Sequence, residues 1–326
     1  MRLVDGSTIL EEYVYDTPSQ QALGRLAEVR YPGGKQVFNY ALNGQLSQRA
    51  FHYDGVANAE TISFEYDSLG RELARVFSDG TRIERQLFSN GWIKSIAGVI
   101  DAVTYDPRGL PTNLVFRNQV RASYAYTPGP GRVSRQETRD PANQLLHRVD
   151  YTFDKMDVML SSNDTSPGGV GLREYRYDPL YQLRSVGSTE NGNSVNRIYD
   201  FGDDYNLRRF DEANATLSYA DGARPDRLTD MVKNGAVASL VSYDGNGNTL
   251  ALPGQKFAYN VKNELTTYTR DDGLVADYRY DHLGHRISKH VRESNGNEFL
   301  TRYVADSAEI DTLSGTRYFE IGRAHV

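Results

Sequence analysis

The chain has 326 residues, a formal net charge of −6, 39% hydrophobic residues and 25% charged residues. These values suit a folded protein that is long enough to bury a substantial core, so we do not expect disorder. The acidic balance offers no concentrated basic face for nucleic acid, and no apolar run approaches the roughly 18 residues of a membrane span. Cysteine is absent, which excludes disulfides, thiolate metal sites and a cysteine nucleophile.

Tyrosine is over-represented in the composition, with 23 Tyr and 12 Phe beside a single Trp, and there are 29 Gly. Aromatic residues favour pleated strands, and glycine favours the tight turns between them. We find no convincing helical apolar period longer than about ten residues. The composition and the pattern therefore predict an all-β protein with almost no helix.

The most informative feature of the sequence is an internal repeat with the pattern Tyr-Asp-x-x-Gly. Asp at the first position of a turn accepts a local backbone hydrogen bond, and Gly at the fourth tolerates positive φ, so each copy predicts a type I turn with a glycine bulge. The clear copies place the structural repeat-motif residues at Tyr66, Asp67, Gly70, Tyr105, Asp106, Gly109, Tyr243, Asp244, Gly247, Tyr280, Asp281 and Gly284. Weaker copies begin at Tyr15-Asp16, Phe153-Asp154, Tyr177-Asp178, Tyr199-Asp200 and Tyr259-Asn260, the last with Asn263 in place of the glycine.

A second set of turn signals alternates with the first. These dipeptides are preferred in two-residue type I′ hairpins, and the intervals between successive turn signals leave room for one strand each. The set comprises Asp79-Gly80, Asn90-Gly91, Asp221-Gly222, Asn234-Gly235, Asp272-Gly273 and Asn295-Gly296. Together the two sets predict a chain that runs up and down as a continuous antiparallel array.

The strands that lead into the turns alternate in polarity, as a two-faced sheet requires. Ile62, Phe64 and Tyr66 fall on one face, while the residues between them are polar. The same alternation recurs over 122–126 and 275–280, so one face carries an aromatic stripe. The stripe admits two interpretations, core packing or stacking platforms for sugar rings, of which packing is the commoner fate of such residues.

These anchors, with Gly-Arg or Gly-x-Leu after the turn, resemble the YD repeats of Rhs proteins, of the C component of insecticidal toxin complexes and of teneurins. The resemblance implies a continuous antiparallel β-hairpin repeat array that coils into a partial hollow shell. It divides the chain into a YD-repeat array at 1–256 and last repeats leading into a truncated Rhs-associated core at 257–320. The family's autoproteolytic aspartate has no counterpart here, because no Asp-Pro-x-Gly segment follows Tyr303. Residues 321–326 read as a translated sequencing adapter, so we expect the natural chain to continue beyond 320.

Two segments resemble metal-binding sites but lack residues that such sites need. Asp244-Gly245-Asn246-Gly247-Asn248 begins like a calcium loop, yet Thr249 stands where the loop needs Gly, and Gln255 where it needs a bidentate Glu. His282, His285 and His290 lie close in sequence, but no nearby carboxylate stands in register as a third zinc ligand. We also find neither a Gly-x-Ser-x-Gly nor a phosphate-binding Gly-x-x-x-x-Gly-Lys pattern.

We therefore assign no catalytic, cofactor or metal residue and expect no enzyme. As the resemblance implies, the leading hypothesis is a wall segment that shields and helps deliver a C-terminal toxin domain absent from this chain. Its partners would be the remainder of its own shell and core and the toxin cargo, at a secreted or bacterial cell-surface location. The alternative is a cell-surface adhesion or carbohydrate-binding array that uses exposed tyrosines. Nucleic acid is not an expected partner.

Overall fold

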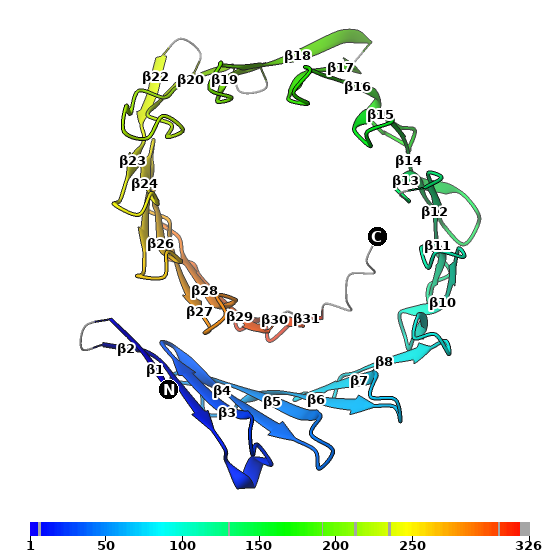
Figure 1. The fold of residues 1–326 in the computed structure, drawn as a ribbon, viewed down its shortest axis with the longest axis vertical. Coiled ribbons are helices and arrows are strands. Elements are labelled where there is room, and N and C mark those ends of the chain that lie inside the picture. Colours follow the sequence, from blue (N-terminus) through cyan, green and yellow to red (C-terminus); the bar gives the residue numbers. More distant parts are fainter. Residues whose placement is uncertain are drawn as a thin grey trace. The chain divides into compact units, whose positions relative to one another are not determined.

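The computed structural model describes residues 1–5, 8–129, 131–190, 192–211, 214–233, 236–305 and 307–319. Strands and turns make up nearly all of these residues, with a short 3-10 segment η1 at Pro18–Gln20 (Figure 1). The all-β prediction is therefore confirmed. No helix among the described residues has the length and apolar character to cross a bilayer.

The chain forms two compact units, one made of the described residues of 1–85 and 242–319, and one made of Gln86–Val241. In the first unit, the N-terminal strands are β1 (Arg2–Asp5), β2 (Thr8–Tyr15), β3 (Leu26–Tyr31), β4 (Gly34–Tyr40), β5 (Leu46–Tyr53), β6 (Glu60–Tyr66), β7 (Glu72–Phe77) and β8 (Arg82–Leu87), whose end belongs to the second unit. Its C-terminal strands are β23 (Ser242–Tyr243), β24 (Thr249–Leu252), β25 (Gln255–Tyr259), β26 (Leu265–Arg270), β27 (Val275–Tyr280), β28 (Arg286–Arg292), β29 (Glu298–Val304), β30 (Ala308–Asp311) and β31 (Arg317–Phe319).

The second unit continues the same pattern. Its strands are β9 (Ile93–Ile96), β10 (Ile100–Tyr105), β11 (Pro111–Phe116), β12 (Arg121–Tyr126), β13 (Val133–Arg139), β14 (Leu145–Phe153), β15 (Met159–Asp164), β16 (Gly171–Tyr177), β17 (Leu183–Glu190), β18 (Asn193–Phe201), β19 (Leu207–Phe210), β20 (Ala215–Ser218), β21 (Asp230–Lys233) and β22 (Ala236–Leu240). Along β1–β8, β9–β22 and β23–β31, each strand pairs antiparallel with the next in sequence. The predicted continuous hairpin array is thereby confirmed. The sequence-based division at 256/257 stays a prediction.

The turns of the second set differ from the prediction. Asp79, Asn90, Asp272 and Asn295 do not have the positive φ that type I′ requires, whereas the following glycines have φ between 85° and 92°. In each case the glycine N–H donates to the carbonyl three residues earlier, as Gly80 does to Phe77 at 2.9 Å. These turns are therefore the same type I turn with a glycine bulge as the Tyr-Asp turns. The Asp221-Gly222 segment forms a wider loop in which the N–H of Arg224 donates to the carbonyl of Asp221, and Asn234-Gly235 lies outside the described residues.

The weaker copies of the repeat divide into two groups. At Asp154, Asp178 and Asn260 the predicted turn forms, and the glycine position is held at positive φ by Asp157, Tyr181 and Asn263, respectively. Two predicted anchors are wrong. Asp16 opens a longer loop, in which its N–H donates to Arg25, and Asp200 lies within β18, because the turn there begins two residues later at Gly202.

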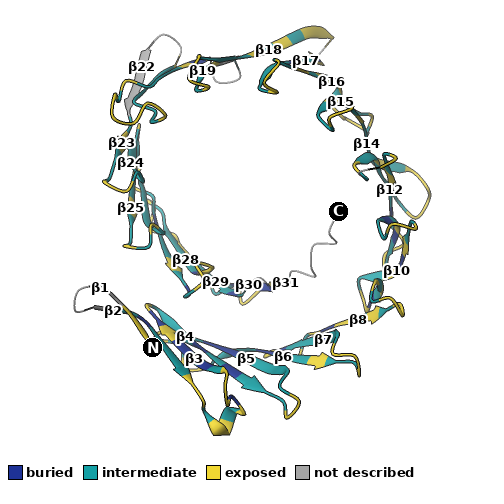
Figure 2. Cartoon of the chain, in the orientation of Figure 1, coloured by how far each residue is buried: buried dark blue, intermediate teal, exposed yellow. Residues whose placement is uncertain are grey.

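The core of the first unit lies on the apolar face of the N-terminal strands. The fully covered side chains come mainly from β3 to β7, as the dark positions on β3, β4 and β5 in Figure 2 show. The largest apolar ones are Phe51, Ile62 and Val29. In the second unit, a smaller core forms around Val103, Leu114 and Ala122. The predicted apolar face, on which Ile62 and Ala122 lie, is therefore the buried one.

Candidate functional site

In the first unit, the N-terminal strands contact the C-terminal strands and turns across an interface that we call the seam. Residues 11–79 supply one side of the seam, and residues 260–319 the other. The seam contacts include Glu11–Lys262, Gln36–Asp281, Tyr53–Tyr303, Arg75–Ser307, Glu60–Arg317 and Phe77–Phe319. The last strands of the array thus lie on the first, and most of these contacts are polar.

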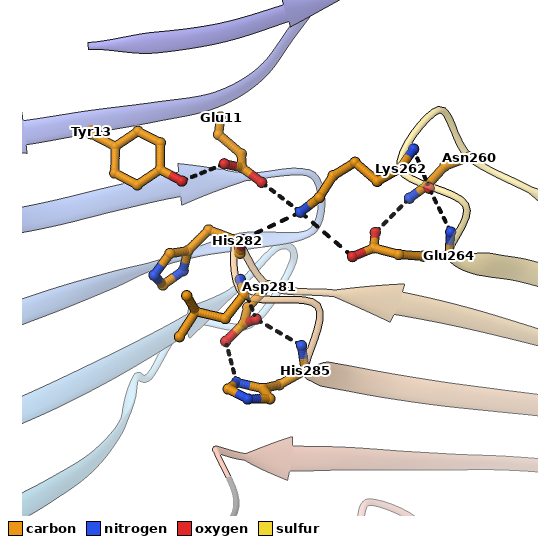
Figure 3. A network of polar contacts seen from close by, with 9 residues as sticks. Glu11, Tyr13, Asn260, Lys262, Glu264, Asp281, His282 and His285 are labelled. Carbon is orange, nitrogen blue, oxygen red and sulfur yellow. Dashed lines mark hydrogen bonds and ion pairs between the residues drawn. The ribbon is translucent and has the colours of Figure 1, made fainter.

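An ion pair between a buried carboxylate and a half-buried lysine lies at one end of the seam (Figure 3). Glu11 is only 4% exposed, and its carboxylate accepts hydrogen bonds from Lys262 Nζ at 2.7 Å and from the Tyr13 hydroxyl at 2.5 Å. Burial lowers the pKa of Lys262, but the hydrogen bond to Glu11 and the charge of Glu264 outweigh it and hold the pKa above its usual value. Burial and the Glu11 carboxylate raise the pKa of Tyr13 to about 12. The cation and the phenol proton therefore both persist at neutral pH.

A second buried polar chain crosses the seam at Asp281, which is 3% exposed. Its Oδ2 accepts a hydrogen bond from Gln36 Nε2 at 3.0 Å, and the Gln36 Oε1 accepts one from Arg49 at 2.7 Å. The Arg49 guanidinium also lies over the ring of Phe51, 4.9 Å from its centroid. Because an amide carries both a donor and an acceptor, Gln36 joins a buried anion to a half-buried cation without a charge of its own.

The role of Asp281 becomes clear from the other Tyr-Asp turns. At all four anchors, Oδ1 accepts the backbone N–H groups two and four residues on. At three of these anchors, the other carboxylate oxygen, Oδ2, accepts a hydrogen bond from a side chain of the same turn. The donor is Arg71 for Asp67, Arg108 for Asp106 and Asn248 for Asp244. At Asp281 this oxygen lies 3.4 Å from the local His285 Nδ1 and also accepts a hydrogen bond from Gln36 across the seam. One repeat turn is thus also a seam contact, and sequence reasoning missed it.

The three histidines occupy separate environments. His282 packs between Tyr31 and Tyr13, with ring centroids 6.2 and 5.9 Å away, and burial lowers its pKa. His285 Nδ1 lies 3.4 Å from Asp281, and His290 pairs with Glu298 at 3.1 Å. The Asp244 segment forms a repeat turn. Among the described residues, no set of three or more histidine and carboxylate side chains is placed to hold a metal ion.

The repeat glycines lie where the turn needs positive φ. Gly70, Gly109, Gly247 and Gly284 have φ of 81°, 87°, 95° and 80°. In each turn, the N–H of the glycine donates to the carbonyl of the aspartate three residues earlier. We propose that these residues set the reversal of each hairpin and contribute to stability through it.

We expect Gly284→Val to lower the free energy of unfolding by about 1–3 kcal/mol, because a β-branched residue is strained at positive φ. A Cβ at position 284 would also lie 3.2 Å from the Glu264 carboxylate. Gly187→Val in β17 is the matched control, since Gly187 lacks a positive φ and a Cβ there meets nothing within 4 Å. Equal denaturant midpoints for Gly284→Val and the unmodified chain would contradict this role.

The anchor tyrosines have a specific partner that the sequence did not indicate. The hydroxyl of Tyr66 donates to the carbonyl of Leu46, and that of Tyr105 donates to Ile93, each at 2.8 Å. The acceptor is the residue directly after the preceding turn at the same end of the sheet. Tyr40, Tyr126 and Tyr280 repeat the contact with Leu26, Pro111 and Leu265. Burial raises the pKa of these tyrosines, so the hydroxyls stay protonated donors. Each tyrosine therefore joins consecutive turns.

Replacing Tyr105 by Phe is expected to cost about 1 kcal/mol, because it removes one hydrogen bond and leaves the Ile93 carbonyl without this donor. The ring contact with Trp92 is kept. The exposed Tyr318→Phe on β31 serves as the control, with no expected change. Denaturant unfolding measures both, and a loss of the same size in the control would argue against the bond.

These features define the chain as a segment of an antiparallel hairpin-repeat array whose strands are joined by Tyr-Asp turns. A sequence profile of the family described as Teneurin YD-shell matches residues 136–306, just over half of the chain. The chain belongs to this family, and the YD-repeat resemblance is confirmed. No match was found among curated protein sequences.

Solved structures support the same fold. The TcdB2-TccC3 complex superposes with a TM-score of 0.78 at 16% identity, covering 96% of this chain and 19% of that chain. TcdB2-TccC3-Cdc42 gives a TM-score of 0.77 at 17% identity, with 93% and 18% covered. A Tc holotoxin pore from Photorhabdus luminescens gives 0.77 at 17% identity, with 94% and 18% covered. The chain thus spans less than a fifth of the length of these solved chains.

Proposed function

We propose that this chain is a wall segment of a YD-repeat shell that encloses and helps deliver a toxin domain located C-terminal to it on the same polypeptide. The seam is the observation that carries the proposal, because it holds the last strands of the array on the first through buried charges. A wall must keep its layers in register without a reactive group, and strand-by-strand pairing leaves few unpaired edges. The family and the Tc structures support this structural role.

The proposed role implies which partners the protein has and where it is located. The partners are the remainder of the same shell and core and the toxin cargo, in a protein that bacteria secrete or display at the cell surface. The residues of the seam act by packing and hydrogen bonding, so we infer no catalytic activity for this segment. Binding of a cell-surface carbohydrate belongs to the alternative, an adhesion array.

The experiment uses the product of the complete gene to which this chain belongs. Limited proteolysis of the purified native protein is followed by mass spectrometry, before and after the seam is opened with denaturant. We expect a C-terminal domain of unrelated sequence that resists protease until the array unfolds, and whose release makes it toxic to target cells. A gene that continues with further repeats or a wall anchor, or a C-terminal domain digested at once in the native protein, would favour adhesion.

A further inference from the structure

Two arginines and a serine lie side by side on three neighbouring strands of the first unit. Arg279 on β27 pairs with Ser288 on β28, and Ser288 pairs with Arg302 on β29. Directly paired residues project from the same face of a sheet, and neighbouring strands are about 4.8 Å apart. The backbones of the two arginines are thus separated by about 10 Å, with the small serine between them.

These three residues line one cavity of about 510 Å³ in the seam. The N-terminal strands contribute Gly33, Tyr53 and Asp54 to its lining. Arg279 extends over Gly33, where a Cβ would come within 2.9 Å of the arginine Cδ. The Arg302 guanidinium lies 5.8 Å from the centroid of the Tyr53 ring. The absence of a side chain at Gly33 therefore leaves room for Arg279, and the cavity has an aromatic wall.

The charges of this cavity are unbalanced. On the next two rows of the same face, Arg292 pairs with Asp277 at 2.5 Å, and His290 pairs with Glu298 at 3.1 Å. Among the described residues, by contrast, neither Arg279 nor Arg302 has a carboxylate within ion-pair distance. Asp54 lines the cavity too, and reduces its positive potential without pairing with either arginine. Two guanidiniums thus line one cavity, and neither forms an ion pair with a carboxylate of the described residues.

We propose that Arg279, Ser288 and Arg302 form a binding site for a tetrahedral oxyanion, a phosphate or sulfate group. Guanidinium groups donate parallel N–H bonds to such anions, and a serine hydroxyl adds a further donor between them. An anion held by both arginines removes their mutual repulsion, and Tyr53 and Leu300 offer apolar surface to a group that carries the anion. This site is separate from the proposed role in a shell, because the wall needs no ligand.

The test is isothermal titration of the full 326-residue chain with inorganic phosphate at constant ionic strength set by sodium chloride. We expect saturable binding of one anion, weakened about tenfold or more by Arg279→Gln and by Ser288→Ala, since hydrogen bonds to a charged group are the strong ones. Lys289→Gln is the matched control, because it removes a positive charge from the same strand as Ser288 but from the opposite face. Circular dichroism confirms that each variant is folded.

Arg302→Lys keeps the charge but loses the forked geometry, so it should also weaken binding while preserving the fold. Titration with glucose 6-phosphate distinguishes the source of the anion: tighter binding than inorganic phosphate indicates an esterified ligand, and equal binding indicates the free anion. Binding that does not saturate, or that Lys289→Gln weakens as much as Arg279→Gln does, would overturn the proposal, because both outcomes indicate a diffuse surface charge.

Discussion

Replacing Lys262 by Met is expected to lower the free energy of unfolding by about 3 kcal/mol. The change removes the cation that neutralises Glu11, a carboxylate with 4% exposure, and leaves its charge buried with the Tyr13 hydroxyl as its remaining side-chain donor. Methionine keeps an unbranched apolar chain, so little packing is lost. The loss of stability arises from the buried Glu11 carboxylate that is left without its cation, so the prediction is specific to this pair.

A double-mutant cycle measures this cost. Glu11→Gln in the Lys262→Met background should recover much of the lost stability, since the buried charge then disappears together with its partner. Arg2→Met is the matched control, because it breaks an exposed pair with Glu12 whose arginine is 59% exposed and which should contribute less than about 1 kcal/mol. Equal losses in Lys262→Met and Arg2→Met, or no recovery in the double variant, would show that the seam pair contributes no more than a surface pair.

The hairpin array could be predicted because its determinants are local. An aspartate that accepts the N–H groups two and four residues on, as Asp67 does, needs only its own turn. The turn type of the second set could not be read in the same way. An Asp-Gly dipeptide has a glycine at positive φ both in a type I′ turn and in a type I turn with a bulge. The two turns differ in which residue before the dipeptide closes the hairpin, and here it is the second one back, as Phe77 is for Asp79-Gly80.

Some turns have a residue other than glycine at the position that needs positive φ. Tyr181 has a φ of 61°, although a bulky residue rarely adopts this region, and Asp157 has a φ of 62°. The strands on both sides fix the hydrogen bonds of the turn, and the residue at that position adopts the backbone they impose. Asn263 and Asp157 are the substitutes that the sequence favours there, because asparagine and aspartate tolerate the left-handed region better than most side chains, whereas Tyr181 is not.

The seam could not be predicted, because its partners are far apart in the chain. Gln36 and Asp281 are separated by 245 positions, and Glu11 and Lys262 by 251. Strand alternation says which side chains share a face, but not which distant sheet covers that face. Arg279, Ser288 and Arg302 were missed for a similar reason, since each is an ordinary polar strand residue until the register aligns them.

Asp281→Ala is expected to cost about 3–4 kcal/mol, whereas Asp67→Ala should cost about 1 kcal/mol. Both substitutions remove a carboxylate oxygen that accepts two backbone N–H groups of the same kind of turn. Asp67→Ala additionally loses a partly exposed bond to Arg71, which contributes little. Asp281→Ala likewise loses a contact with the exposed His285, which contributes little, and it also leaves the fully buried Gln36 amide without its acceptor.

The difference between the two variants therefore isolates the seam contribution of one repeat turn. Denaturant unfolding of both gives this difference, and Gln36→Leu tests it from the other side. Leucine at position 36 removes the link between Asp281 and Arg49, so the combined Gln36→Leu and Asp281→Ala variant should lose less than the sum of the single variants. If Asp281→Ala and Asp67→Ala proved equally costly, the turn at Asp281 would serve its own hairpin alone, and the layers would be held by the remaining contacts.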